Sequence, residues 1–174
     1  GAGAPPAFEA AAAGGKVLQV VETHITAGQS QSIGATTVTN ITNFSAAITP
    51  VATSSKIMIW VSWSGELSIS EAYTHTFGLK RGTTVIGEAA SPGNRISGFF
   101  SVSLSYFAAD NSSTPESSAF QYLDSPSTSS EVVYSVTAHN KNAHTLYTSR
   151  TKDDADNTSY TRTTSTLTLM EIGA

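Results

Sequence analysis

The chain has 174 residues, a length that suits a single domain with a sizeable hydrophobic core. Only 13% of the residues are charged, and the net charge is −4 at pH 7. No run of Lys or Arg and no apolar stretch of membrane-spanning length is present, so neither nucleic-acid binding nor membrane insertion is expected. Cysteine is absent, which excludes disulfides, Cys-ligated metal sites and thiol nucleophiles.

Hydroxyl side chains take the place of the missing charges. The sequence holds 26 Ser and 24 Thr. Thr favours strands because its branched Cβ fits a pleated surface. A surface rich in Ser and Thr is common among extracellular β proteins, and without disulfides such a protein needs another source of robustness. Oligomerisation is one such source.

Residues 1–15 differ in composition from the rest. They read "GAGAPPAFEAAAAGG", with Ala, Gly and two prolines and a single aromatic residue. We interpret this stretch as a linker, or as the end of a fibre shaft that precedes the domain. Residues 16–174 are predicted to form one β-sandwich domain.

From Lys16 onward, apolar and polar residues alternate with a period of two, which is typical of half-buried strands. In three segments, "YTHTFGL", "SVSLSYF" and "EVVYSVTA", the apolar side chains fall on one face. The residues predicted to share these faces are Tyr73, His75, Phe77 and Leu79, then Val102, Leu104 and Tyr106, then Val132, Tyr134, Val136 and Ala138.

The segment "KIMIWVSW" differs, because both of its faces are apolar. One face carries Ile57, Ile59, Val61 and Trp63. The other carries Met58 and Trp60. A strand of this kind is either central in a sheet or covered by a second chain. We predict that Met58 and Trp60 contact a neighbouring chain, and that His75 is a histidine of the core or of that same interface.

Gly, Pro, Asn and Asp clusters separate the strands at short intervals, and no helical segment of useful length occurs. The sequence therefore predicts an all-β fold: an antiparallel β-sandwich, jelly-roll-like, of about ten strands. The last strand is predicted to run without interruption from Thr158 to Ile172. Leu167 and Leu169 would lie on one face of it, and Met170 and Ile172 on the other.

His139 and His144 flank the segment "NKNA", which resembles a hairpin tip. In a hairpin the two histidines would face each other across two strands, as a polar pair or, less readily, as metal ligands.

Polar stretches near the C-terminus are candidates for receptor contact. Tyr147 and Tyr160 could stack on a sugar ring while neighbouring amides and carboxylates bind its hydroxyls, or both tyrosines could pack inside the sandwich. We place the receptor contacts in loops 139–144 and 150–160. The candidates are Asn140, Lys141, Asn142, His144, Arg150, Lys152, Asp154, Asn157 and Tyr160.

The stretch "DDADN" is the one acidic cluster, and its oxygens are of the kind that hard cations bind. Asp153, Asp154 and Asp156 are thus weak candidates for a cation site, although Asp and Asn are also ordinary turn residues. No metal and no cofactor is expected. The sequence contains no nucleophile elbow, P-loop or dinucleotide fingerprint, and its carboxylates are scattered, so the chain is predicted not to be an enzyme.

Several segments together resemble a domain that is widespread in tailed bacteriophages, especially marine ones, at the C-terminal end of tail-fibre and similar virion proteins. The resemblance covers nearly the whole chain, including the Gly/Ala/Pro stretch at its start. The segments that carry it are "GKVLQVVETHIT", "ITPVATSSKIMIWVSWSG", "LKRGTTVIGEAA", "YLDSPSTSSEVVYSVTA" and "RTTSTLTLMEIGA".

The resemblance implies a virion surface module that is homotrimeric, extracellular and in contact with other virion proteins. Its motifs are structural, so it assigns no catalytic residue. The function expected is non-enzymatic attachment to a glycan or protein receptor on the host surface. The alternative is a capsid decoration or head-fibre protein. A secreted lectin-like module is less favoured, since it is supported only by N-x-[ST] sequons at Asn40, Asn43, Asn111 and Asn157.

Overall fold

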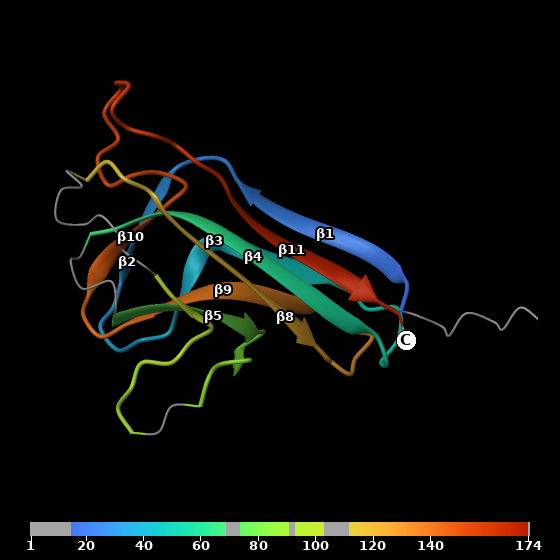
Figure 1. The fold of residues 1–174 in the computed structure, drawn as a ribbon. Helices are drawn as coiled ribbons and strands as arrows, with labels where there is room; N and C mark the ends of the chain where they lie inside the picture. Colours follow the sequence, from blue (N-terminus) through green and yellow to red (C-terminus); the bar gives the residue numbers. More distant parts are fainter. Residues whose placement is uncertain (1–14, 69–73, 91–92, 103–111, 174) are drawn as a thin grey trace, which may run out of the picture.

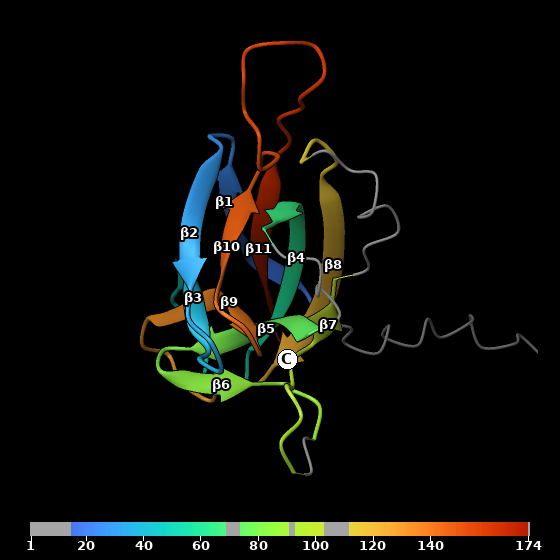
Figure 2. The same cartoon turned by 90° about the vertical axis from the view of Figure 1, so that its left-hand side faces the viewer.

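The computed structural model describes residues 15–68, 74–90, 93–102 and 112–173. The described chain forms two antiparallel sheets that lie face to face, as Figures 1 and 2 show. The predicted β-sandwich is therefore confirmed, while its jelly-roll connectivity stays a prediction. Within the described ranges there is no helix, and hence none that could span a membrane.

The first sheet has six strands in the order β1-β11-β4-β10-β2, with β8 paired to β4. They are β1 (Val17–Ile25), β2 (Gln29–Ile33), β4 (Lys56–Leu67), β8 (Glu116–Asp124), β10 (His144–Thr148) and β11 (Ser165–Ile172). The second sheet has five strands in the order β3-β9-β5-β6, with β7 paired to β5. They are β3 (Thr39–Ile48), β5 (His75–Arg81), β6 (Thr84–Ile86), β7 (Phe100–Ser101) and β9 (Val132–Asn140).

The core lies between the sheets and follows the alternation in the sequence. Trp63 of the first sheet packs against Phe77 of the second, with ring centroids 4.8 Å apart. The inward residues predicted on three strands are buried: Ile57, Ile59, Val61 and Trp63 on β4, His75, Phe77 and Leu79 on β5, and Val132, Tyr134, Val136 and Ala138 on β9. Val102 is buried as well, whereas Tyr73, Leu104 and Tyr106 lie outside the described residues.

Strand β4 is central in its sheet, which explains one of its two apolar faces. It pairs with β11 along one edge and with β8 along the other. Its inward residues fill the core, while Met58 is half-buried and Trp60 is exposed on the outer face. The predicted division of this strand into two faces is confirmed, and the outer face remains open within the described chain.

The prediction of one strand from Thr158 to Ile172 is wrong. Strand β11 begins only at Ser165, and residues 149–164 leave the sheet as a long loop, seen in orange-red at the top of Figure 2. The sheet offers this segment no partner, because β10 occupies the edge of β4 at Gly65–Leu67 and β1 ends at Ile25, opposite Ser165. Beyond Ser165 the strand is as expected, with Leu167 and Leu169 inward and Met170 and Ile172 half-buried on the other face.

The predicted hairpin between His139 and His144 is also wrong. Strand β9 belongs to the second sheet and β10 to the first, so residues 141–143 carry the chain from one sheet to the other. The register of β9 is set by β3 and β5, and that of β10 by β2 and β4. A short polar connection fits a crossing between sheets as well as a hairpin, and the sequence alone did not separate the two.

Candidate functional site: the distal loop

The distal loop, residues 149–164, connects two strands that pair with successive parts of the same edge of β4. Strands β10 and β11 both run antiparallel to β4 and follow one another along it, β10 opposite Gly65–Leu67 and β11 opposite Lys56–Ser62. The chain leaves this line at Ser149, which has a left-handed backbone (φ 62°), and returns at Ser165. The loop therefore projects from the end of the sandwich opposite to the start of β1 (Figure 1).

Buried serines close the neck of this loop. The Ser149 hydroxyl donates to the carbonyl of Ile25 at 3.0 Å and lies 3.1 Å from the Ser165 hydroxyl. The Ser165 hydroxyl in turn donates to the carbonyl of Ser64 and accepts from its backbone N–H. Small hydroxyls suit this place, because they satisfy the backbone groups freed by the break in the strand without adding volume.

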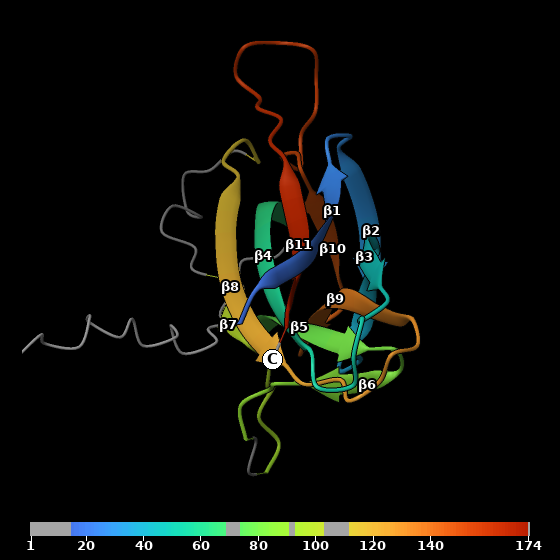
Figure 3. The ribbon, with the colours of Figure 1, turned by 90° about the vertical axis from the view of Figure 1, so that its right-hand side faces the viewer.

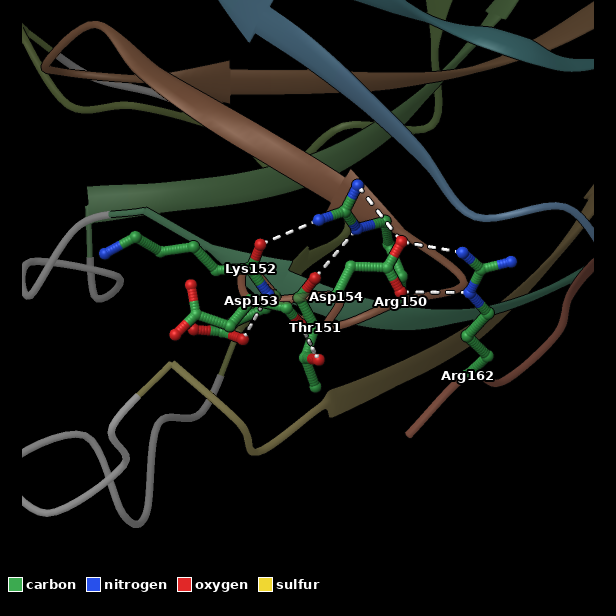
Figure 4. Close-up of polar contacts among 7 residues, drawn as sticks. Arg150, Thr151, Lys152, Asp153, Asp154 and Arg162 are labelled. Carbon is green, nitrogen blue, oxygen red and sulfur yellow. Dashed lines mark hydrogen bonds and ion pairs between the residues drawn. The ribbon is translucent and has the colours of Figure 1, made fainter. Parts of the chain in front are cut away.

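A carboxylate held by two arginines organises the first half of the loop (Figure 4). Arg162 donates from Nε and Nη2 to the two oxygens of Asp154, at 2.9 and 2.7 Å. Arg150 lies 3.5 Å from the same carboxylate. The hydrogen bonds from Arg162 hold the pKa of Asp154 below its usual range, and the positive charge of Arg150 acts in the same direction.

The arginines also tie this carboxylate to the sheet. Arg150 donates to the carbonyls of Thr151 and Lys152, and its guanidinium lies 5.2 Å from the centre of the Tyr147 ring on β10. Arg150 and Arg162 additionally form an isolated β-bridge, which narrows the loop near its neck. Cation–π contact and charge-assisted hydrogen bonds of this kind are among the stronger polar interactions near a surface.

A buried carboxylate of the first sheet binds the backbone at the base of the loop. Glu66 of β4 is 1% exposed, and it accepts a hydrogen bond of 2.7 Å from the backbone N–H of Lys152. The Thr151 side chain, which is buried, donates to the carbonyl of Asp153. The backbone that follows Arg150 is thus tied to the sheet at Lys152 before the loop reaches solvent.

Beyond this base the loop encloses a polar hollow of about 430 Å³, lined by Asp154, Ala155, Asp156, Asn157, Tyr160 and Arg162. Asn157 shapes the tip, because its side-chain oxygen accepts from the backbone N–H of Ser159 at 2.8 Å. Tyr160 is half-buried, so part of its ring is accessible. The hollow thus combines an aromatic ring, an amide, a carboxylate and a guanidinium, which are groups that can bind a hydroxyl-rich ligand.

The structure brings some of the predicted receptor residues together and separates others. Asp154, Asn157 and Tyr160 line the hollow, while Arg150 and Lys152 lie in its base. The 139–144 segment sits at the far end of β10, so the two predicted loops do not form one surface. Within it, Asn140 is fully buried and His144 is 8% exposed, so neither is available for receptor contact and their assignment is wrong. Lys141 and Asn142 are exposed at that other end.

His75 is an interior residue and not part of an interface between chains. Its side chain is fully buried between the sheets, where its ring packs edge-on against Phe77 and His144, with centroids 4.8 and 5.0 Å away. The core alternative weighed for this residue is therefore the right one. Burial, together with the nearby His144 and His139, lowers the pKa of His75 to about 3, so its ring is neutral at physiological pH.

The structure does not bring the three weak cation candidates together as one group of carboxylate ligands. Within the described ranges no three His, Asp or Glu side chains are arranged to hold a metal ion. The carboxylate of Asp154 is bound by Arg162 and Arg150, and an arginine-neutralised carboxylate is a poor cation ligand. The acidic cluster of the sequence is thus turn and loop structure.

Sequence reasoning missed three parts of this site. Arg162 was not singled out, although it organises the loop through Asp154. Glu66 was seen only as one scattered carboxylate, and the serines of the neck only as surface hydroxyls. The one signal available was the pairing of "SR" and "TR" on either side of an acidic stretch, which is compatible with an arginine-bound carboxylate.

Comparison with known proteins adds no assignment. No protein-family model matches the chain, and a search of curated proteins finds no match. The resemblance to bacteriophage fibre domains therefore stays an expectation from the sequence.

Proposed function

We propose that the chain is a non-enzymatic attachment domain of a virion surface protein, of the bacteriophage tail-fibre type, and that the distal loop contacts a glycan on the host surface. The observation that carries this proposal is the built hollow at the tip of the distal loop. It lies at the opposite end of the sandwich from Lys16 and Gly173, whose backbones are hydrogen-bonded to each other at 2.8 Å. Lys16 follows the stretch interpreted as a linker, and a ligand surface at the end of the sandwich away from that stretch is what a distal domain requires.

The chemistry of the hollow favours a hydroxyl-rich ligand over a cation. Because Asp154 is neutralised by two arginines, the groups left to face a ligand are Asp156, Asn157 and Tyr160. An accessible aromatic ring beside an amide and a carboxylate is a common arrangement for binding a sugar, where the ring covers an apolar face and the oxygens bind hydroxyls.

The two carboxylates that line this hollow lie in different surroundings. Glycoside hydrolysis uses two carboxyl groups placed across the scissile bond. The two carboxylates of the hollow differ, since Asp154 is occupied by arginines and Asp156 is exposed. Release of reducing sugar from a host polysaccharide by the purified protein would contradict the non-enzymatic assignment.

The test is binding to a bacterial glycan array by the wild-type chain and by Asn157→Ala and Tyr160→Ala variants. Both variants are expected to lose at least about tenfold in affinity, because each removes a group that lines the hollow. The matched control is Asn94→Ala, which changes an exposed asparagine that is distant in sequence from the distal loop. This variant should bind as the wild type does. Equal binding by all four proteins would show that the hollow is not the receptor site.

The outer face of β4 favours a second candidate function. Met58 and Trp60 leave that face apolar, and a capsid decoration or head-fibre protein would use such a face against a capsid lattice. Immunolabelling of intact particles separates the candidates. Label at the tail ends, with array binding, supports attachment, and label on the heads, with no glycan bound, supports decoration.

A further inference from the structure

The outer face of the first sheet carries an apolar row that crosses four strands. Val20, Met170, Met58 and Leu123 lie next to one another in register on β1, β11, β4 and β8. Val20 is 54% exposed and Leu123 is 43% exposed, and Trp60, two residues beyond Met58, is 47% exposed. Side by side, these residues form one surface, which we call the apolar row. Figure 3 shows β1, β11, β4 and β8 along this side of the molecule.

Polar residues border the apolar row on two sides. Glu22, Thr168 and Gln121 lie in register with Trp60, and Lys56 lies on the opposite side, beside the half-buried Ile172 with which it pairs. Beside Trp60, Ala119 and Gln121 the face is hollowed into a groove of about 430 Å³. An apolar centre with a polar rim is the usual composition of an interface, and a monomer seldom leaves such a patch open.

Two opposite charges are placed symmetrically about the centre of this surface. On β11, Met170 lies midway between Ile172, which pairs with Lys56 on β4, and Thr168, which pairs with Glu22 on β1. Lys56 and Glu22 are therefore diagonally opposed across Met170. With ordinary strand spacings their Cα atoms are roughly 16 Å apart, too far for an ion pair within one chain. The Thr168 hydroxyl donates to Glu22 at 3.1 Å and orients its carboxylate.

We propose that the apolar row is the interface with a second copy of this chain, packed face to face about a two-fold axis that passes over Met170. Such an axis lies in the plane of the contact and exchanges the two diagonal positions. Lys56 of each copy then faces Glu22 of the other, and Trp60 of each copy falls near Leu123 of the other. A two-fold contact must be self-complementary in this way, and the row with its diagonal charges meets the requirement.

The area of the outer face of the first sheet indicates how tightly the dimer should associate. Four strands of about eight residues present roughly 500 Å² in projection at ordinary strand spacings. This is toward the small end of specific interfaces, which bury about 800 Å² per partner, so we expect a dissociation constant in the micromolar range. The proposal concerns assembly alone. It departs from the homotrimer that the resemblance to fibre domains implies, and it holds whether or not the distal loop binds a glycan.

Charge reversal tests the proposal. The proteins are the wild type, Lys56→Glu, Glu22→Lys and the double variant, and the measurement is sedimentation equilibrium from about 1 to 300 µM. The wild type should dimerise. Each single variant should weaken the dimer by about tenfold or more, because symmetry turns two attractive contacts into two repulsive ones. The double variant should return to within about threefold of the wild type.

The design separates a specific contact from an effect of net charge. Lys56→Glu makes the chain more negative and Glu22→Lys makes it less negative, so a general effect of charge would give opposite signs. Lys152→Glu, which changes the charge equally on the distal loop, is the matched control and should leave dimerisation unchanged. A monomer at 300 µM, a trimer, or a double variant as weak as the singles would overturn the proposal.

A second measurement does not depend on electrostatics. Because the chain has no cysteine, Met170→Cys introduces a single thiol at the proposed axis. A bismaleimide reagent that spans the distance of about 10 Å between facing sheets should then give a covalent dimer in high yield. Val133→Cys, at an exposed position of the second sheet, is the control and should stay uncrosslinked. Equal crosslinking of both variants would contradict the proposed face.

Discussion

His75 should make the fold sensitive to acid. The side chain is fully buried, and neither of its ring nitrogens has a hydrogen-bond partner within the described chain. The titratable groups that face it among these residues are His144 and His139. A positive charge on either ring would repel a proton on His75. With its pKa lowered to about 3, chiefly by burial, the ring is neutral in the folded protein over most of the acidic range.

The sign and size of the effect follow from linkage. In the unfolded chain His75 has an ordinary pKa near 6.5, so between about pH 6.5 and 3 the unfolded state binds a proton that the folded state does not. Stability therefore falls as the pH falls through this window. At pH 4 the loss from this single residue is about 3 kcal/mol, since each pH unit below 6.5 contributes about 1.4 kcal/mol. That is a large part of the stability of a typical domain.

The assay is urea unfolding at pH 7 and pH 4 for the wild type and His75→Phe. Phenylalanine keeps an aromatic ring against Phe77 but cannot take up a proton. The difference in unfolding free energy between the two pH values should be smaller in the variant by about 3 kcal/mol. His24→Gln, on an exposed position of β1, is the control and should behave as the wild type. An equal pH dependence in all three proteins would refute the reasoning.

Three further predictions concern the two tryptophans, the neck and the loop. Trp63→Ser should lower the free energy of unfolding by about 3–5 kcal/mol in urea titrations, because it empties the core, while Trp60→Ser should cost under about 1 kcal/mol in the monomer and weaken the dimer. Ser165→Ala should cost about 1–3 kcal/mol in the same titration, since it leaves the buried N–H of Ser64 without its acceptor, whereas Thr166→Ala beside it should cost less. Arg162→Ala should speed amide hydrogen exchange in residues 153–161 and leave exchange in β4 unchanged, and unchanged exchange in the loop would show that the pair with Asp154 does not hold it.

The same ion pair gives the loop its own pH dependence. Because hydrogen bonds from Arg162 lower the pKa of Asp154, the pair contributes to loop order above the ordinary range of an aspartate. That contribution is lost as the pH falls through the lowered value. Exchange in the loop should thus quicken only at a lower pH than a typical aspartate would require. Quickening already near the ordinary aspartate pKa would contradict this account.

The sequence predicted the sandwich and much of its core because alternation with period two reports directly which side chains face inward. The inward residues of β4, β5 and β9 are all buried as expected. The same alternation placed Met58 and Trp60 on the opposite face of β4, where the structure has them. Periodicity of this kind is local, so it survives without knowledge of which strands are neighbours.

What the sequence did not predict depends on pairing between distant segments. The step from His139 to His144 was interpreted as a hairpin, because alternation does not tell whether consecutive strands share a sheet. The threonines before Ser165 suggested strand by their propensity, but β10 already occupies the edge of β4 along which that segment would have to extend. Asn140 was assigned to a receptor surface, and His75 was left between the core and an interface, for the same reason: their burial is created by the other sheet.

The distal loop departs from and rejoins a single line of strand at two serines whose hydroxyls are 3.1 Å apart. Its length and sequence can therefore change without shifting the register of β10 or β11, since both ends meet at one fixed point of the sheet. The cost of lengthening a loop with fixed ends grows only slowly with its length. The sandwich is thus a natural display scaffold: a new recognition peptide inserted between Ser149 and Ser165 would be presented at the far end of the domain on an unchanged frame.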